Sequence, residues 1–148
     1  IPSALQVEHR VIHEALLRAT KAPGDIGTAA RELAGALHDH FVREEEIALP
    51  PLGLLAALAR GEFTPEMRAV LPMTEALRAE LPRMLDEHQA IHAATRRLGE
   101  VARKAGNAEV QQLAEALALH AQSEEEVFYP AALLVGEVVE SRSQAHGS

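Results

Sequence analysis

The stretch HDHFVREEEIALPPL, residues 38–52, contains two histidines, three consecutive glutamates and a closing pair of prolines. A second stretch, HAQSEEEVFYPAAL at residues 120–133, repeats this layout. In each one a histidine precedes a glutamate by four positions, His40 with Glu44 and His120 with Glu124. Residues four apart lie one above the other on a helix, so each pair can direct two polar side chains to one place.

Apolar residues around both stretches recur at steps of three and four, which indicates helices that each bury one face. Prolines, glycines and capping residues divide the chain into four long helices, at about 3–21, 28–49, 74–105 and 107–140. Pro82 interrupts the third helix, which should kink or restart there. Residues 52–72 are apolar but irregular, and they predict a short helical insertion between the second and third helices.

The sequence therefore predicts an all-α fold, an up-down-up-down four-helix bundle. A single domain is expected over residues 1–140, followed by a polar, disordered tail at 141–148. The composition agrees, because 47% of the 148 residues are hydrophobic while only 3% are aromatic, which favours helices over sheets.

Composition also argues against several classes of protein. The formal net charge of −8 disfavours binding to nucleic acid or to an anionic membrane. The absence of cysteine excludes disulfides, thiolate catalysis and thiolate metal sites. The sequence has no apolar run that could span a bilayer and no signal-peptide pattern, so a cytoplasmic location is expected. No Ser-His-Asp set, phosphate loop or nucleotide fingerprint is present.

Ionisable residues occupy the apolar stripe of all four predicted helices. The first and third helices carry paired histidines, in EHRVIH (8–13) and EHQAIH (87–92). Each buried polar group without a partner would cost about 2–7 kcal/mol, against a typical folding free energy of about 5–15 kcal/mol. A metal would satisfy these groups, because neutral imidazoles and carboxylates are its ligands. The candidate ligands are His9, His13, His40, Glu44, His88, His92, His120 and Glu124.

The number and type of these side chains indicate two ions rather than one. Two ions bridged by Glu44 and Glu124 would use them well, and imidazole with carboxylate suits iron, zinc or copper better than calcium or magnesium. Glu45 and Glu125 lie about 100° round their helices from the stripe and are expected at the surface or behind the ligands. Tyr129 is expected either to pack at the end of the fourth helix or to form a hydrogen bond near the site.

Four motifs in a fixed order, EHRVIH, HFVREEEIALP, EHQAIH and HAQSEEEVFYP, span residues 8–130. With them the chain resembles the hemerythrin-like family, the HHE cation-binding domain. The resemblance implies a non-haem di-iron centre, with two iron ions joined by carboxylates and by an oxo or hydroxo bridge. Zinc or another transition metal is the less favoured occupant.

Carried over by position, the resemblance implies terminal ligands at His9, His40, His88 and His120, and bridges at Glu44 and Glu124. The pattern of the oxygen-carrying members adds His92 and leaves His13 surplus. Those members have an aspartate five residues after the fourth helix's histidine, whereas Glu124 follows His120 at four. That spacing resembles the cation-binding and sensing members.

Together these features predict a protein that binds or reacts with a small oxidant, namely dioxygen, peroxide or nitric oxide. Six bound histidines would leave both ions closed, so reaction requires that His13 or His92 is not a ligand. Apolar neighbours are expected to limit water, and these are Ile12, Ile47, Ile91 and Val127. One alternative is an iron- or redox-sensing module without turnover, binding a protein partner through residues 52–72. Another is a structural metal site.

Overall fold

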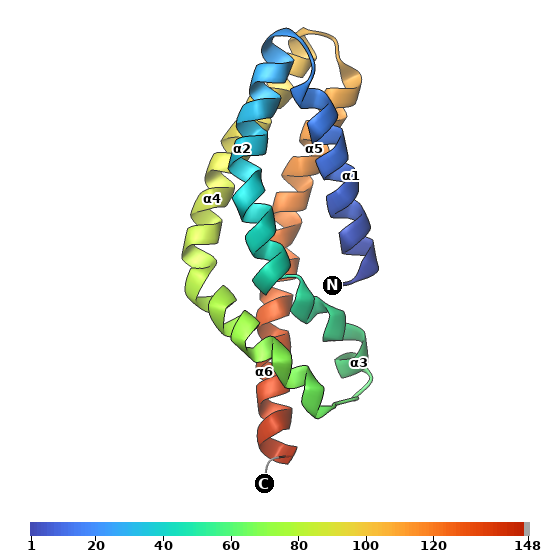
Figure 1. Ribbon diagram of the computed structural model, residues 1–148, viewed down its shortest axis with the longest axis vertical. Helices are drawn as coiled ribbons and strands as arrows, with labels where there is room; N and C mark the ends of the chain where they lie inside the picture. Colours follow the sequence, from blue (N-terminus) through green and yellow to red (C-terminus); the bar gives the residue numbers. More distant parts are fainter. Residues whose placement is uncertain (147–148) are drawn as a thin grey trace.

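Four long helical segments form an up-down-up-down bundle in the computed structural model, which describes residues 1–146 (Figure 1). Within that range all regular structure is helical, as predicted. The bundle consists of α1 (Ser3–Thr20), α2 (Gly24–Ile47), α4 (Leu71–Lys104) and α5 (Ala108–Ser123). The last of these continues through a π-helix, η3 (Glu124–Phe128), into α6 (Tyr129–His146).

The predicted insertion between the second and third long helices is present and lies beside α6 at the lower end of the bundle (Figure 1). It comprises η1 (Pro50–Leu54), α3 (Leu55–Ala59) and η2 (Pro65–Val70). Val70 packs with Val135 and Val139 of α6, together with partly buried apolar residues of the insertion. Much of the apolar surface noted in the sequence is thus used within the chain.

Two helix starts differ from the sequence prediction. The second long helix begins at Gly24, and Thr28 lies inside it, donating its hydroxyl to the Gly24 carbonyl rather than capping the helix. The third begins at Leu71 and runs without a break through Pro82. Figure 1 shows that α4 changes direction along its first half, as expected where a proline removes a backbone donor and crowds the preceding turn.

The expectation of a disordered tail from residue 141 is wrong up to residue 146, because α6 continues to His146. The insertion supplies the reason. Arg142 donates a hydrogen bond to the Gly61 carbonyl and lies over the Phe63 ring, 5.6 Å from its centroid. Residues 147–148 of the predicted tail lie outside the described residues.

A widened turn between α5 and α6 decides what the last helix buries. In η3 the Tyr129 N–H bonds to the Glu124 carbonyl, five residues back. The extra residue rotates the following helix, so Tyr129 is 1% exposed whereas Val127 is 55% exposed. The expectation that Val127 limits water is therefore wrong. Pro130 gives a physical reason for the wide turn, because it lacks an N–H and its ring crowds the carbonyl of Glu126.

Two apolar clusters of the core leave a polar layer between them. One cluster contains Leu16, Leu33, Leu98 and Leu117, and the other contains Ile47, Leu77 and Met84. Along α2, along α4, and from α5 into α6, the buried histidines fall between residues of the first cluster and residues of the second. The layer is therefore enclosed by apolar side chains along the length of the bundle.

Candidate metal centre

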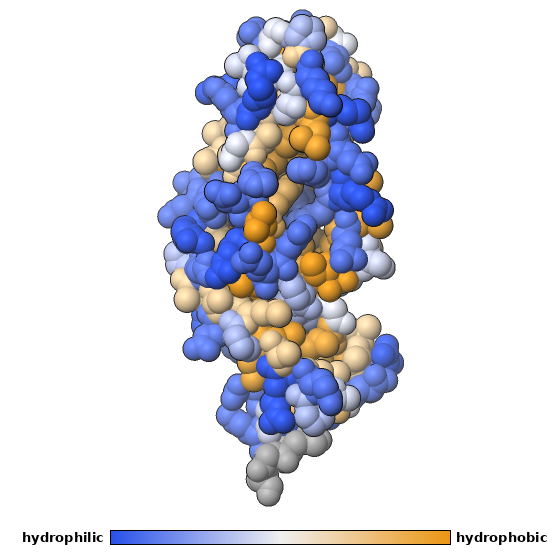
Figure 2. All heavy atoms as spheres, in the orientation of Figure 1, coloured by the Kyte–Doolittle hydropathy of each residue, from blue (hydrophilic) through white to orange (hydrophobic). Residues whose placement is uncertain are grey.

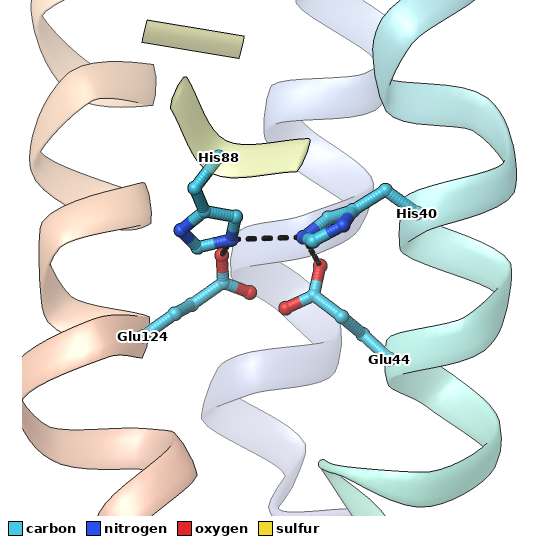
Figure 3. Close-up of side chains that lie close together, drawn as sticks. All are labelled: His40, Glu44, His88 and Glu124. Carbon is cyan, nitrogen blue, oxygen red and sulfur yellow. Dashed lines mark hydrogen bonds and ion pairs between the residues drawn. The ribbon is translucent and has the colours of Figure 1, made fainter. Parts of the chain in front are cut away.

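Six of the predicted ligands meet in the polar layer, where each is at most 5% exposed. They form two groups whose ligand atoms lie within 4.8 Å of one another. One group is His40, Glu44, His88 and Glu124, and the other is His9, His120 and Glu124. Figure 3 shows the first group, in which His40 and Glu44 of α2, His88 of α4 and Glu124 of η3 point toward one another. Glu124 belongs to both groups, as a bridging carboxylate would.

The imidazoles present the same nitrogen to the interior. His40 Nε2 lies 2.8 Å from His88 Nε2, and His9 Nε2 lies 2.9 Å from His120 Nε2. Glu124 places one oxygen 3.3 Å from His88 Nε2 and the other 3.3 Å from His120 Nε2. Such convergence of nitrogen and carboxylate oxygen suits a transition-metal ion.

Buried atoms without hydrogen bonds test whether a cation fits this arrangement. Glu44 Oε1 and Glu124 Oε2 are both buried and accept no hydrogen bond, although each lies 3.3 Å from an imidazole Nε2. Buried carboxylate oxygens left unpaired are costly, and two facing nitrogens can share only one proton. A cation among these atoms would satisfy all of them, so the residues present fit a metal.

Burial controls the electrostatics of the layer. It lowers the pKa of His40, His88 and His120 below the ordinary histidine value, which favours the neutral imidazole that a metal requires. It also raises the pKa of Glu124 to about 7. A bound cation would oppose this last effect, because positive charge favours the carboxylate.

Tyr129 takes both roles that the sequence left open. Its ring packs in the second apolar cluster, and its hydroxyl donates to Glu44 Oε2 at 2.9 Å. The same hydroxyl lies 3.2 Å from His40 Nε2 and 3.1 Å from His88 Nε2. Burial raises its pKa well above the ordinary tyrosine value, so the hydroxyl remains a hydrogen-bond donor.

Two further histidines named in the sequence lie outside this layer. His13 is exposed and borders a pocket of about 680 Å³ between α1 and α2, which also touches His9 and Phe41. His92 is half-buried, and its Nε2 lies 3.4 Å from Glu125 Oε1 at the edge of the layer. His38 is exposed.

The surface around the layer is mixed. Figure 2 shows a largely hydrophilic face on which hydrophobic side chains emerge in small groups between the helices. Within residues 1–146, no helix combines the length and apolar character that crossing a membrane requires.

Comparison with known proteins identifies the family. The Hemerythrin HHE cation binding domain matches residues 1–132 of this chain. The chain belongs to that family. Searches of curated proteins and of solved structures each give no match. The buried His/Glu layer of this hemerythrin-like domain lies within the matched region, and its composition is compatible with a metal-binding site.

Some contacts in the hemerythrin-like domain were not assigned from the sequence. Glu87 Oε1 lies 3.1 Å from His40 Nδ1, and Glu8 contacts His120 Nδ1 closely. Both glutamates are partly exposed, so helical periodicity alone assigns them to the solvated face. The available signal was their repetition, since a glutamate directly precedes a histidine in both EHRVIH and EHQAIH.

Proposed function

We propose that this hemerythrin-like domain holds two iron ions and binds or reacts with a small oxidant, namely dioxygen, peroxide or nitric oxide. One observation carries the proposal, namely that two buried ligand groups share Glu124. Imidazole and carboxylate donors suit iron, with zinc or another transition metal as the less favoured occupant. Iron bound here would supply one-electron redox chemistry to a small ligand.

The side chains divide the work of binding. His9, His40, His88 and His120 would hold the ions through Nε2, together with the carboxylates of Glu44 and Glu124. Of these two carboxylates, only Glu124 belongs to both groups. Within the described residues, the group around His9 contains only three side chains, and His13 lies outside it. This smaller set of protein donors leaves room for a small ligand, as an open position does in catalytic zinc sites.

Apolar side chains lie on both sides of the ligand layer along the bundle. Ile12, Ile47 and Ile91 are each at most 6% exposed, and they belong to the two clusters that flank the layer. Such a boundary excludes bulk water and favours small, weakly hydrated oxidants over large polar substrates.

A sensing module is the second candidate, because the insertion is joined directly to a ligand. The Glu44 carbonyl accepts from both the Ala48 and the Leu49 N–H, each at 2.9 Å, and η1 begins at Pro50. A shift of Glu44 on metal loading would therefore reach residues 52–72, where a protein partner would bind. Partner binding that ignores metal state would contradict this candidate.

Metal analysis with optical spectroscopy tests the main proposal. Protein from iron-supplemented cells is expected to contain about two iron ions per chain and to show visible absorption that changes on adding peroxide, dioxygen or nitric oxide. His40→Ala should lose iron, whereas His38→Ala, two residues away on the exposed face of α2, should retain it. Colourless, iron-free protein, or a zinc-loaded protein with no response, would contradict the proposal.

A further inference from the structure

Each of the four buried imidazoles has a carboxylate at its outward nitrogen, Nδ1. Glu125 Oε1 lies 2.8 Å from His88 Nδ1, and Glu87 Oε1 lies 3.1 Å from His40 Nδ1. The other two contacts join Glu8 to His120 Nδ1, and Glu45 to His9 Nδ1 at 3.7 Å. The four Nε2 atoms meanwhile face inward in pairs.

These contacts form a closed circuit around the bundle. The carboxylate of α1 supports the histidine of α5, that of η3 supports α4, that of α4 supports α2, and that of α2 supports α1. Every carboxylate is also the sequence neighbour of an inward-facing ligand. The four neighbouring pairs are Glu8–His9, Glu44–Glu45, Glu87–His88 and Glu124–Glu125. Each helix therefore contributes a ligand and braces the ligand of a neighbouring helix.

Arginine does not neutralise this circuit in the ion pairs formed within residues 1–146. Arg43 pairs with Glu46 and Glu80, and the other arginines in ion pairs meet Glu32, Glu62, Glu80 or Glu137. Among the described residues, imidazoles are the only basic groups within 4.0 Å of the circuit's carboxylate oxygens. Their side chains are 32–56% exposed, so they keep contact with water while touching the buried rings.

We propose that Glu8, Glu45, Glu87 and Glu125 are positioning residues that form an outer carboxylate ring around the metal centre. Glu8, Glu87 and Glu125 each hold an imidazole as the Nδ1–H tautomer, with the Nε2 lone pair directed inward, and increase the basicity of that nitrogen. Glu45 acts more weakly on His9, from 3.7 Å. The ring therefore strengthens metal binding. Its four negative charges also stabilise the more highly charged state of a redox-active ion, which lowers the reduction potential. The inference rests on the proposed metal centre, but not on its reaction with an oxidant.

The geometry ranks the members of the ring. Glu125 Oε1 lies closer to its imidazole Nδ1 than Glu87 Oε1 does, and it also approaches His92. Glu45 lies beyond hydrogen-bond distance from His9 Nδ1, and that nitrogen has no hydrogen-bond partner. Both residues of this weaker pair border the pocket between α1 and α2. Replacing Glu125 should therefore have a larger effect than replacing Glu45.

Zinc and cobalt binding test the ring without requiring any iron chemistry. Chelator competition should show that Glu125→Ala binds either ion about 10–100-fold more weakly than the wild type. Glu125→Gln should recover part of that loss, because its amide oxygen still accepts from Nδ1–H. Glu126→Ala is the matched control, since Glu126 is exposed and contacts Gln122. Circular dichroism melting of metal-free samples shows whether each variant folds.

Two readouts separate positioning from general stability. Long-range ¹H–¹⁵N spectra of the zinc-loaded protein should show four histidines protonated at Nδ1, with the His88 proton signal shifted in Glu125→Gln. In iron-loaded protein, Glu125→Gln and Glu87→Gln should raise the reduction potential, and Glu126→Gln should leave it unchanged.

Equal zinc and cobalt affinity in Glu125→Ala and Glu126→Ala would overturn the ring, as would zinc bound through Nδ1. A wild-type protein that binds none of the three metals would overturn the proposed function as well. If only the ring proposal is wrong, the wild type will still bind metal, which distinguishes this outcome from failure of the proposed function.

Discussion

The Tyr129 hydroxyl donates a hydrogen bond to Glu44 Oε2 at 2.9 Å, although the two residues are 85 positions apart. Tyr129 follows the wide turn of η3, and Glu44 lies in the last turn of α2. The bond therefore ties the two halves of the chain together inside the ligand layer. It also fixes the orientation of a carboxylate whose other oxygen, Oε1, has no hydrogen-bond partner.

Tyr129→Phe removes this bond while keeping the ring. Because Glu44 Oε2 would lose its donor in a buried site, the metal-free variant should be less stable by about 1–3 kcal/mol. Urea denaturation in the presence of a chelator measures the difference. Metal binding should survive, since the imidazole and carboxylate atoms remain. Equal unfolding curves for the two proteins would contradict this role of Tyr129.

Glu124→Gln tests the cost of a buried carboxylate. Burial raises the pKa of Glu124 from 4.5 to about 7, so the folded protein binds the proton more tightly than the unfolded chain does. This contribution to stability is present below pH 4.5 and is lost as the pH rises to 7, an effect of about 3 kcal/mol. Between pH 4.5 and 8 the stability of the metal-free wild type should therefore fall relative to that of Glu124→Gln. Denaturation at several pH values measures both slopes, and parallel slopes would argue against the raised pKa.

Three histidines should produce the opposite trend. Burial lowers the pKa of His40, His88 and His120 in the folded protein, so their contribution is present above the ordinary value of 6.5 and is lost as the pH falls below it. Metal-free protein should melt at lower temperature as the pH falls through this range. His40→Gln should flatten the trend, whereas the exposed His38→Gln should not.

Removal of metal should lower the melting temperature. An ion that binds only the folded state at 100 times its dissociation constant stabilises a protein by about 2.7 kcal/mol. For a chain of this size that corresponds to a rise of about 5–10 °C. Calorimetry with iron or zinc, followed by excess chelator, measures the rise and its reversal. If neither metal nor chelator changes the melting temperature, the buried histidines do not bind metal.

His9→Ala and His13→Ala form a matched pair on α1. His9 is 5% exposed and belongs to a ligand group, whereas His13 is exposed on the same helix. Elemental analysis should show reduced metal content in the first variant and wild-type content in the second. Loss of metal in His13→Ala would mean that this side chain turns inward when metal binds.

Helical periodicity was sufficient to predict the bundle and the inward orientation of six candidate ligands. His40 and Glu44, for example, lie one turn apart on the stripe that contains Leu37 and Ile47, so any packed α2 must bury them together. The repeat of this pair at His120 and Glu124 then predicted the centre. These conclusions depend only on the spacing of residues along a single helix, which can be counted directly in the sequence.

Periodicity failed where the backbone departs from an α-helix or where a role depends on a neighbouring helix. The π-helix at Glu124–Phe128 exchanges Val127 for Tyr129 on the buried face, and a count by threes and fours cannot anticipate the extra residue. The role of Glu87 depends on its contact with His40, which lies 47 residues away on another helix. Likewise, residues 141–146 are helical because Arg142 contacts the insertion, which the polar composition of this segment does not reveal.

The membership of Glu124 in both ligand groups has a consequence for how the centre fills. An ion that binds to His88 and one oxygen of Glu124 fixes the other oxygen beside His120, so the second group is assembled before its own ion arrives. If the centre holds two ions as proposed, their binding should therefore be positively cooperative. A titration with metal should pass from empty to doubly loaded chains with few singly loaded ones, a distribution that native mass spectrometry would resolve.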